Sequence, residues 1–136
     1  MRIITSIGLV GLLLLVMNNC TNSTINKQET EQATITKELR HIVLFKFKET
    51  TTSENIKKVE NAFAALPSKI KEIKAFEWGT NNSPEGLDKG FTHSFVVTFD
   101  SEEGRAIYLP HPDHQAFVEV LKPHLEDVLV IDYWVK

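Results

Sequence analysis

The sequence predicts an α+β domain in which a four-stranded antiparallel sheet carries helices on one face. Two observations support this fold class. Four segments place apolar residues at every second position, which is the period of a β-strand, and the segments between them place apolar residues at every third or fourth position, which is the period of a helix. All of these segments lie within residues 38–136 of a 136-residue chain. That length suits one compact core and excludes a multi-domain enzyme.

The first strand is expected at residues 39–48. In this segment the residues alternate between two faces, and apolar side chains occur on both. His41, Val43, Phe45 and Phe47 share one face, and Ile42 and Leu44 lie on the other. A strand of this kind is expected to be covered on both sides.

The first helix is expected to follow at once. Thr51 and Glu54 have the spacing of a capping box, and Pro67 sets the end of the helix. The apolar positions that recur at helical spacing between them are Ile56, Val59, Ala62, Phe63 and Leu66.

Two further strands are expected around a loop. Residues 73–79 form the second strand, with Phe76 and Trp78 on one face, and residues 81–90 are rich in Asn, Ser, Pro and Gly, as loops are. Residues 91–99 form the third strand and show the clearest alternation in the chain. The face expected to be buried carries Phe91, His93, Phe95, Val97 and Phe99.

The last part of the domain is expected to contain two helices and a strand. Asp100 and Glu103 can cap a short helix that reaches Tyr108, and Pro112 suits the first turn of the next helix. The residues of that helix expected to face inward are Phe117, Val120 and Leu121. Residues 127–136 form the fourth strand, again with apolar residues on both faces.

The helices can cover only one face of this sheet, so the apolar residues on the other face need a second surface. Leaving a whole sheet face in water would cost a small domain much of its stability, at about 25 cal/mol per Å² of apolar area. We therefore expect a homodimer joined sheet to sheet. The alternative is a monomer whose second face binds a different partner.

The amino terminus resembles a bacterial lipoprotein signal. Arg2 precedes an apolar run at residues 3–17, which is shorter than the roughly 20 residues that a membrane-spanning helix needs. We expect residues 1–19 to be a signal peptide, Cys20 to be lipidated and residues 20–37 to form a flexible tether. The expected location is the bacterial cell envelope, with the lipid on Cys20 holding the protein to a membrane. The alternatives are an uncleaved anchor helix and a secretory signal without lipid.

Charge and cysteine content exclude several classes of function. The formal net charge is -3, so the chain has no basic field to hold nucleic acid, which is not an expected partner. A single cysteine allows no intramolecular disulfide and no cysteine cluster for a metal. Any chemistry must therefore come from His, Tyr and carboxylate side chains, and no cofactor is expected.

Five separated motifs, in order, resemble the stress-responsive alpha/beta barrel (Dabb) family. They are Arg40 to Lys48, Trp78-Gly79, Gly90 to His93, Tyr108 followed by His111 to His114, and Ile131 to Tyr133. The resemblance implies a ferredoxin-like fold and a dimeric alpha/beta barrel. The family's functions are mixed, because many members are known only as stress-induced proteins and one is a polyketide cyclase that catalyses an intramolecular aldol condensation.

The same resemblance implies the site residues. Tyr108 and His114 correspond to the cyclase's catalytic tyrosine and histidine, and His41 and His93 resemble histidines that line its pocket. An aldol step needs a base to take a proton and a donor to hold the enolate oxygen. His114 is expected in a first helical turn, where the helix dipole keeps imidazole neutral, and Tyr108 can hydrogen-bond the carbonyl.

Trp78 and His111 are further ligand-binding candidates, although His111 also suits a structural place near the helix cap. Histidines such as His41 and His93 are, taken singly, more often satisfied core residues than ligands. His111 and His114 could approach a divalent ion, but no third ligand is evident, so no metal site is expected.

Three functions from different classes follow. The first is a binding module for a small apolar or aromatic molecule in a pocket between sheet and helices, with a possible role in stress response. The alternative is a cyclase-like or lyase enzyme that uses His114 as base and Tyr108 as donor. The third is a structural or stress-protective protein without a ligand, since one fold hosts many activities.

Overall fold

The computed structural model describes residues 37–136. The predicted signal peptide, Cys20 and all of the predicted tether before residue 37 lie outside the described residues. Within residues 37–136, no helix has the length and apolar character needed to cross a membrane.

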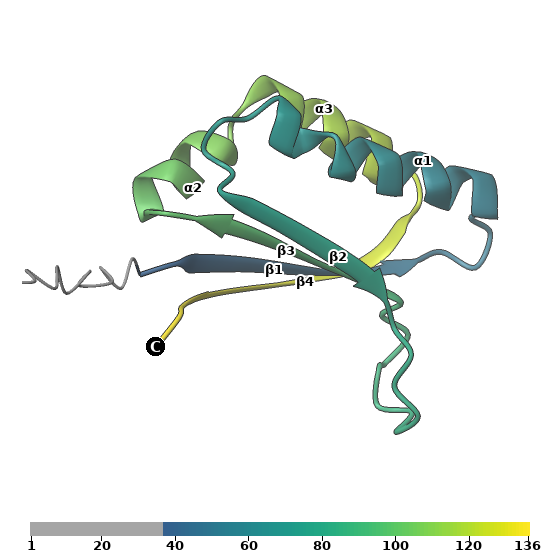
Figure 1. Cartoon of the computed structure of the whole chain (residues 1–136). Helices are drawn as coiled ribbons and strands as arrows, with labels where there is room; N and C mark the ends of the chain where they lie inside the picture. Colours follow the sequence, from purple (N-terminus) through teal and green to yellow (C-terminus); the bar gives the residue numbers. More distant parts are fainter. Residues whose placement is uncertain (1–36) are drawn as a thin grey trace, which may run out of the picture. The chain divides into compact units, whose positions relative to one another are not determined.

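The domain has helices on one face of a four-stranded antiparallel sheet (Figure 1). The elements, in chain order, are β1 (Leu39–Phe47), α1 (Ser53–Ala64), the 3-10 helix η1 (Leu66–Ser68), β2 (Ala75–Thr80), β3 (His93–Phe99), α2 (Glu102–Tyr108), α3 (Pro112–Leu121) and β4 (Leu125–Trp134). The strand order is β2-β3-β1-β4, with the first and third strands in the centre. This is the arrangement of a ferredoxin-like fold, so the predicted α+β class is confirmed.

The strand boundaries differ from the predicted ones by up to two residues. β3 begins at His93 rather than at Phe91. Phe91 and Thr92 belong to the loop, where the Thr92 amide donates to the carbonyl of Phe45 at 3.0 Å. β4 begins at Leu125 and ends at Trp134, because its pairing with β1 extends to the bulge at Lys46/Phe47.

The helix caps lie one residue later than predicted in two of three cases. The hydroxyl of Thr52, not Thr51, accepts from the Asn55 amide at 3.3 Å. The hydroxyl of Ser101, next to Asp100, accepts from the Gly104 amide at 3.1 Å. α3 begins as predicted, with Pro112 in its first turn.

The core lies between the helices and the sheet. Its buried apolar residues are Leu39, Val43, Phe45, Val59, Phe63, Leu66, Ile70, Ile73, Phe95, Val97, Phe99, Tyr108, Phe117 and Leu121. The prediction that Val120 faces inward is wrong, because it is 41% exposed. At about 100° per residue it lies beside the stripe formed by Phe117 and Leu121, and Val118 packs against the core from the other side instead.

The opposite face of the sheet, here called the outer face, is apolar, and none of the helices in residues 37–136 covers it. Its residues alternate with the core residues and are Ile42, Leu44, Ser94, Val96, Leu129, Ile131 and Tyr133. Leu129, Ile131 and Tyr133 are 41–47% exposed. The prediction of a strand layer with apolar residues on both faces is thus confirmed.

Candidate functional site

A cavity of about 470 Å³ lies between the helices and the half of the sheet formed by β1 and β4; it is called the site cavity here. Most of its wall is apolar. The lining residues are His41, Val43, Phe45, Phe63, Tyr108, Leu109, His114, Phe117, Val118, Leu121, Lys122, Leu125, Val128, Val130 and Asp132. The ring of Tyr108 lies next to the rings of His41 and His114, so three of the predicted site residues meet in one place.

Tyr108 is the last residue of α2, and it is fully buried. Its ring centre lies 4.3 Å from that of His114 and 5.9 Å from that of His41. Among the described residues nothing accepts or donates a hydrogen bond at its hydroxyl. Burial raises the pKa of the Tyr108 phenol, so the hydroxyl keeps its proton and can donate a hydrogen bond to a molecule in the cavity.

His114 is the third residue of α3, in its first turn as predicted. Its Nδ1 donates to the carbonyl oxygen of Leu109 at 2.8 Å. A carbonyl can only accept, so Nδ1 carries the proton and Nε2 of the neutral ring is a proton acceptor. Burial lowers the pKa of His114, the nearby His41 and His111 lower it further, and the bond to Leu109 opposes them. The ring is therefore suited to act as a base near neutral pH.

His41 is held by the carboxylate of Asp132, for which the sequence alone predicts no role. Its Nδ1 donates to Oδ1 of Asp132 at 2.7 Å, and Oδ2 of Asp132 accepts from Nη1 of Arg105 at 2.9 Å. Asp132 lies directly opposite His41 in the pairing of β1 with β4. The sequence nevertheless contained a signal that could have identified Asp132. This residue is a lone carboxylate that alternates with Val130 and Trp134 on a core-facing strand.

His93 and Trp78 lie outside the site cavity. His93 pairs in register with Phe45, which is four residues, or about 13 Å, along β1 from His41. Its Nε2 lies 3.2 Å from Oε1 of Glu60, and its Nδ1 lies 2.8 Å from the hydroxyl of Thr92. Trp78 stacks on the same ring, with 8° between the planes. Both ring nitrogens of His93 thus have protein partners, as in a satisfied core histidine.

His111 is also outside the cavity lining. It is the N-cap of α3, and its Nδ1 accepts from the amide of Asp113 at 3.2 Å. Its place in the structure is that of a capping residue. Among residues 37–136, no three His, Cys, Asp or Glu side chains are grouped so that they could hold a metal ion.

The chain resembles plant proteins along most of their length. It is 40% identical over 95 residues to the stress-response A/B barrel domain-containing protein HS1 of Arabidopsis thaliana, and the match covers 70% of this chain and 87% of that protein. It is 30% identical over 95 residues to olivetolic acid cyclase of Cannabis sativa, over 70% of this chain and 94% of the cyclase.

Solved structures resemble the fold as well. The hydroxynitrile lyase from Passiflora edulis matches with a TM-score of 0.70 at 26% identity, covering 74% of this chain and 95% of the lyase. A dimeric ferredoxin-like protein from Thermobifida fusca matches with a TM-score of 0.62 at 31% identity, covering 73% of this chain and 92% of that one. The family model for the stress responsive A/B barrel domain (Dabb) matches residues 39–135, and this chain therefore belongs to that family.

Proposed function

We propose that this protein binds a small, largely apolar molecule that carries a carbonyl oxygen, in the site cavity. The observation that carries the proposal is the buried hydroxyl of Tyr108, which has no partner among the described residues. A buried donor without an acceptor costs free energy, about 1–3 kcal/mol. A ligand oxygen in the cavity would remove that cost.

The rest of the cavity suits the same class of ligand. A volume of about 470 Å³ lies within the range of small-molecule sites, and such sites are mostly apolar with a few polar groups that fix the ligand's orientation. Here the polar groups of His41, Tyr108, His114 and Asp132 occur together, and the remaining wall comes mainly from Val, Leu and Phe side chains.

The test compares two probes of similar shape, butyrophenone and butylbenzene, which differ in the carbonyl oxygen. Calorimetric titration should show about three- to tenfold tighter binding of the ketone, the worth of one hydrogen bond. Tyr108→Phe should remove this preference and leave the hydrocarbon's affinity unchanged. A ketone preference that survives in Tyr108→Phe would contradict the proposal.

A second candidate function is proton transfer at a carbon next to a carbonyl, as in a cyclase or lyase. It is favoured by the contact between the neutral His114 ring and the Tyr108 ring, and by the names of two relatives, a cyclase and a lyase. Nε2 of His114 would take the α-proton, and the Tyr108 hydroxyl would donate to the enolate oxygen that forms.

This second candidate is tested by following exchange of the α-hydrogens of butyrophenone for deuterium in D₂O by NMR. His114→Ala should slow the exchange by about 10²- to 10⁴-fold while ketone binding persists. His124→Ala removes a histidine outside the cavity and is the matched control. Exchange at the uncatalysed rate with the unmodified protein would exclude this chemistry and leave the binding function standing.

We propose further that the protein is a homodimer joined through its outer face. The supporting observations are the apolar character of that face and the description of similar solved structures as dimeric. Sedimentation of residues 37–136, which contain the core described above, should give twice the monomer mass. A monomer at micromolar concentration would contradict this assembly.

Export and lipid attachment at Cys20 complete the proposal, together with a role in stress response. The order of charged, apolar and cysteine residues at the amino terminus supports export and lipid attachment. Membership of the stress responsive A/B barrel family supports the role in stress response. Mass spectrometry of the mature amino terminus should find a lipid on Cys20. An unmodified Cys20 in the membrane fraction would exclude lipidation.

A further inference from the structure

The loop between β2 and β3, residues 81–92, projects from the sheet on the side opposite the helices (Figure 1). It is called the arm here. It contains Leu87, which is 76% exposed and is the most exposed large apolar side chain in the described part of the chain.

Hydrogen bonds to Asp88 join the two ends of the arm. Oδ1 of Asp88 accepts from the Gly90 amide at 2.6 Å, and Oδ2 accepts from Nδ2 of Asn81 at 3.2 Å. Gly90 has a φ of 86°, in the left-handed region that favours glycine over residues with a Cβ. A preformed loop loses less entropy when it binds a partner than a loose one does.

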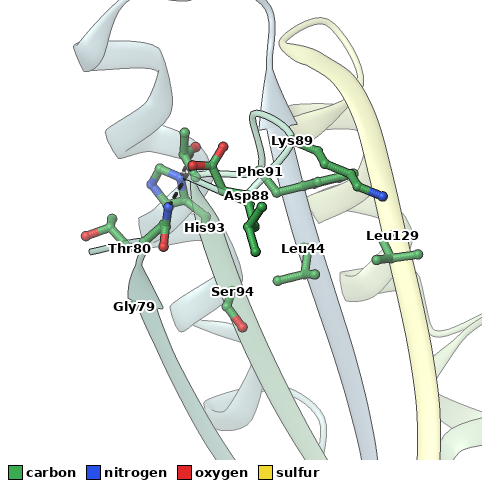
Figure 2. Close-up of a pocket in the computed structure, with 12 residues that line it drawn as sticks. Leu44, Gly79, Thr80, Asp88, Lys89, Phe91, His93, Ser94 and Leu129 are labelled. Atoms are coloured by element: carbon green, nitrogen blue, oxygen red, sulfur yellow. Dashed lines mark hydrogen bonds between the residues drawn. The ribbon is translucent and has the colours of Figure 1, made fainter. Parts of the chain in front are cut away.

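A second cavity, of about 520 Å³, lies between the arm and the outer face, and it is called the outer pocket here. Leu44 of β1, Leu129 of β4 and Phe91 of the arm line it (Figure 2). It is on the opposite side of the sheet from the site cavity. Leu87 of the same arm also lines the outer pocket, and the polar lining residues are Thr80, Asn81, Asp88, Lys89, Thr92, His93 and Ser94.

The outer pocket continues into the apolar centre of the outer face. Charged side chains occur at the rim of that face, where Arg40 binds Glu38 and Lys46 binds Glu126. An apolar centre inside a polar rim is the usual composition of a protein interface. Similar solved structures are described as dimeric. The partner that fits the outer face is therefore a second copy of this chain.

We infer that the arm is a clasp between two copies of the chain, in which Leu87 of each protomer packs on the outer face of its partner and partner side chains fill the outer pocket. This inference rests on the proposed homodimer. Two-fold symmetry places two arms in each dimer, so one substitution removes two apolar contacts.

The test measures self-association of the full chain, purified in detergent from cells that express it with two different tags. Leu87→Asp should reduce the co-purified fraction at least about tenfold, because two large apolar side chains lose their buried contacts. Val120→Asp, an equally charged change on the helical side of the domain, should leave it unchanged. Leu129→Asp, in the floor of the outer pocket, should abolish it.

A photoactivated cross-linker at position 87 provides a second measurement, which should yield a covalent dimer linked to an outer-face peptide. Failure of the unmodified chain to co-purify would overturn the homodimer and the clasp together. The clasp alone would be overturned if co-purification is lost in Leu129→Asp but kept in Leu87→Asp. It would also be overturned if cross-links form only within one chain. Equal losses in Leu87→Asp and Val120→Asp would also overturn it.

Discussion

The two ends of the helix-facing side of the sheet contain similar residues. They differ in whether a buried polar group lacks a hydrogen-bond partner. His41 and His93 are 6% and 7% exposed, and each lies beside a carboxylate, Asp132 in one case and Glu60 in the other. His41 lines the site cavity and His93 lines the outer pocket, but among residues 37–136 only the His41 end contains a buried hydroxyl without a partner. Burial beside a carboxylate therefore does not distinguish the two ends, whereas the unpaired hydroxyl of Tyr108, a residue that lines the site cavity, does.

The contacts at the His93 end stabilise the fold. Burial alone would raise the pKa of Glu60, but hydrogen bonds and charges from Lys57 and His93 lower it below its ordinary value. Phe47 packs edge-on against His93, and Trp78 stacks on it. Four predictions test whether the two ends are as different as these contacts indicate.

The largest effect is expected from Glu60→Leu, which leaves His93 buried without its carboxylate. The free energy of unfolding should fall by about 3 kcal/mol, as measured by chemical denaturation. Binding of butyrophenone to the folded protein should be unchanged. Glu54→Leu removes an exposed carboxylate from the same helix and should change little. Loss of ketone affinity in Glu60→Leu would show that the two ends are not independent.

Asp132→Ala should have a smaller effect on stability and a clear effect on binding. It leaves Nδ1 of His41 buried without an acceptor and Arg105 without its carboxylate, so unfolding should become easier by about 2 kcal/mol. Ketone affinity should fall severalfold because His41 and Asp132 line the cavity. Asp127→Ala, an exposed carboxylate on the same strand, is the control, and an equal loss of affinity there would argue against a specific role for Asp132.

Tyr108→Phe should leave stability unchanged or raise it by up to about 1 kcal/mol, because it removes a buried hydroxyl that has no partner among residues 37–136. Thermal denaturation without ligand measures this. Tyr133→Phe, at a half-exposed tyrosine, should have no effect. A marked loss of stability in Tyr108→Phe would mean that the hydroxyl is satisfied in the free protein, which removes the main support for the ligand's carbonyl.

The smallest effect concerns the titration of His114. Its pKa in the folded protein should lie below the ordinary 6.5, and NMR shifts of the imidazole protons measure it. The unfolded chain then binds more protons than the folded one between the two pKa values. Stability therefore increases with pH in that window and is lost as the pH falls through the folded pKa. A pKa at or above 6.5 would contradict the predicted effect of burial on this ring.

The order of the elements could be predicted because each has its own local pattern. Alternation marked β1 and β3, and prolines marked the end of α1 and the start of α3. The caps at Thr52 and Ser101 were missed by one residue, because Thr or Asp precedes each and neighbouring polar residues compete for the same amides. Val120 was misplaced because its exposure depends on how α3 is turned toward the sheet, which packing decides.

Only the site residues that lie close together in the sequence could be predicted to meet. Tyr108 and His114 lie six positions apart around a single turn, so their proximity is local. His93 shares a strand pattern with His41 but lies about 13 Å further along the sheet. Asp132 is 91 positions from His41 and meets it only through strand register.

The sequence by itself determined the fold class and the two apolar faces of the sheet, since the period of apolar residues is a local property that burial must satisfy. Only the tertiary structure decided which polar residues are paired and which are free. Hydrogen bonding of a buried group depends on what the register and the helix packing bring within about 3 Å, and residues distant in sequence supply most of those partners. The Asp132 contact and the free Tyr108 hydroxyl are both consequences of that assembly.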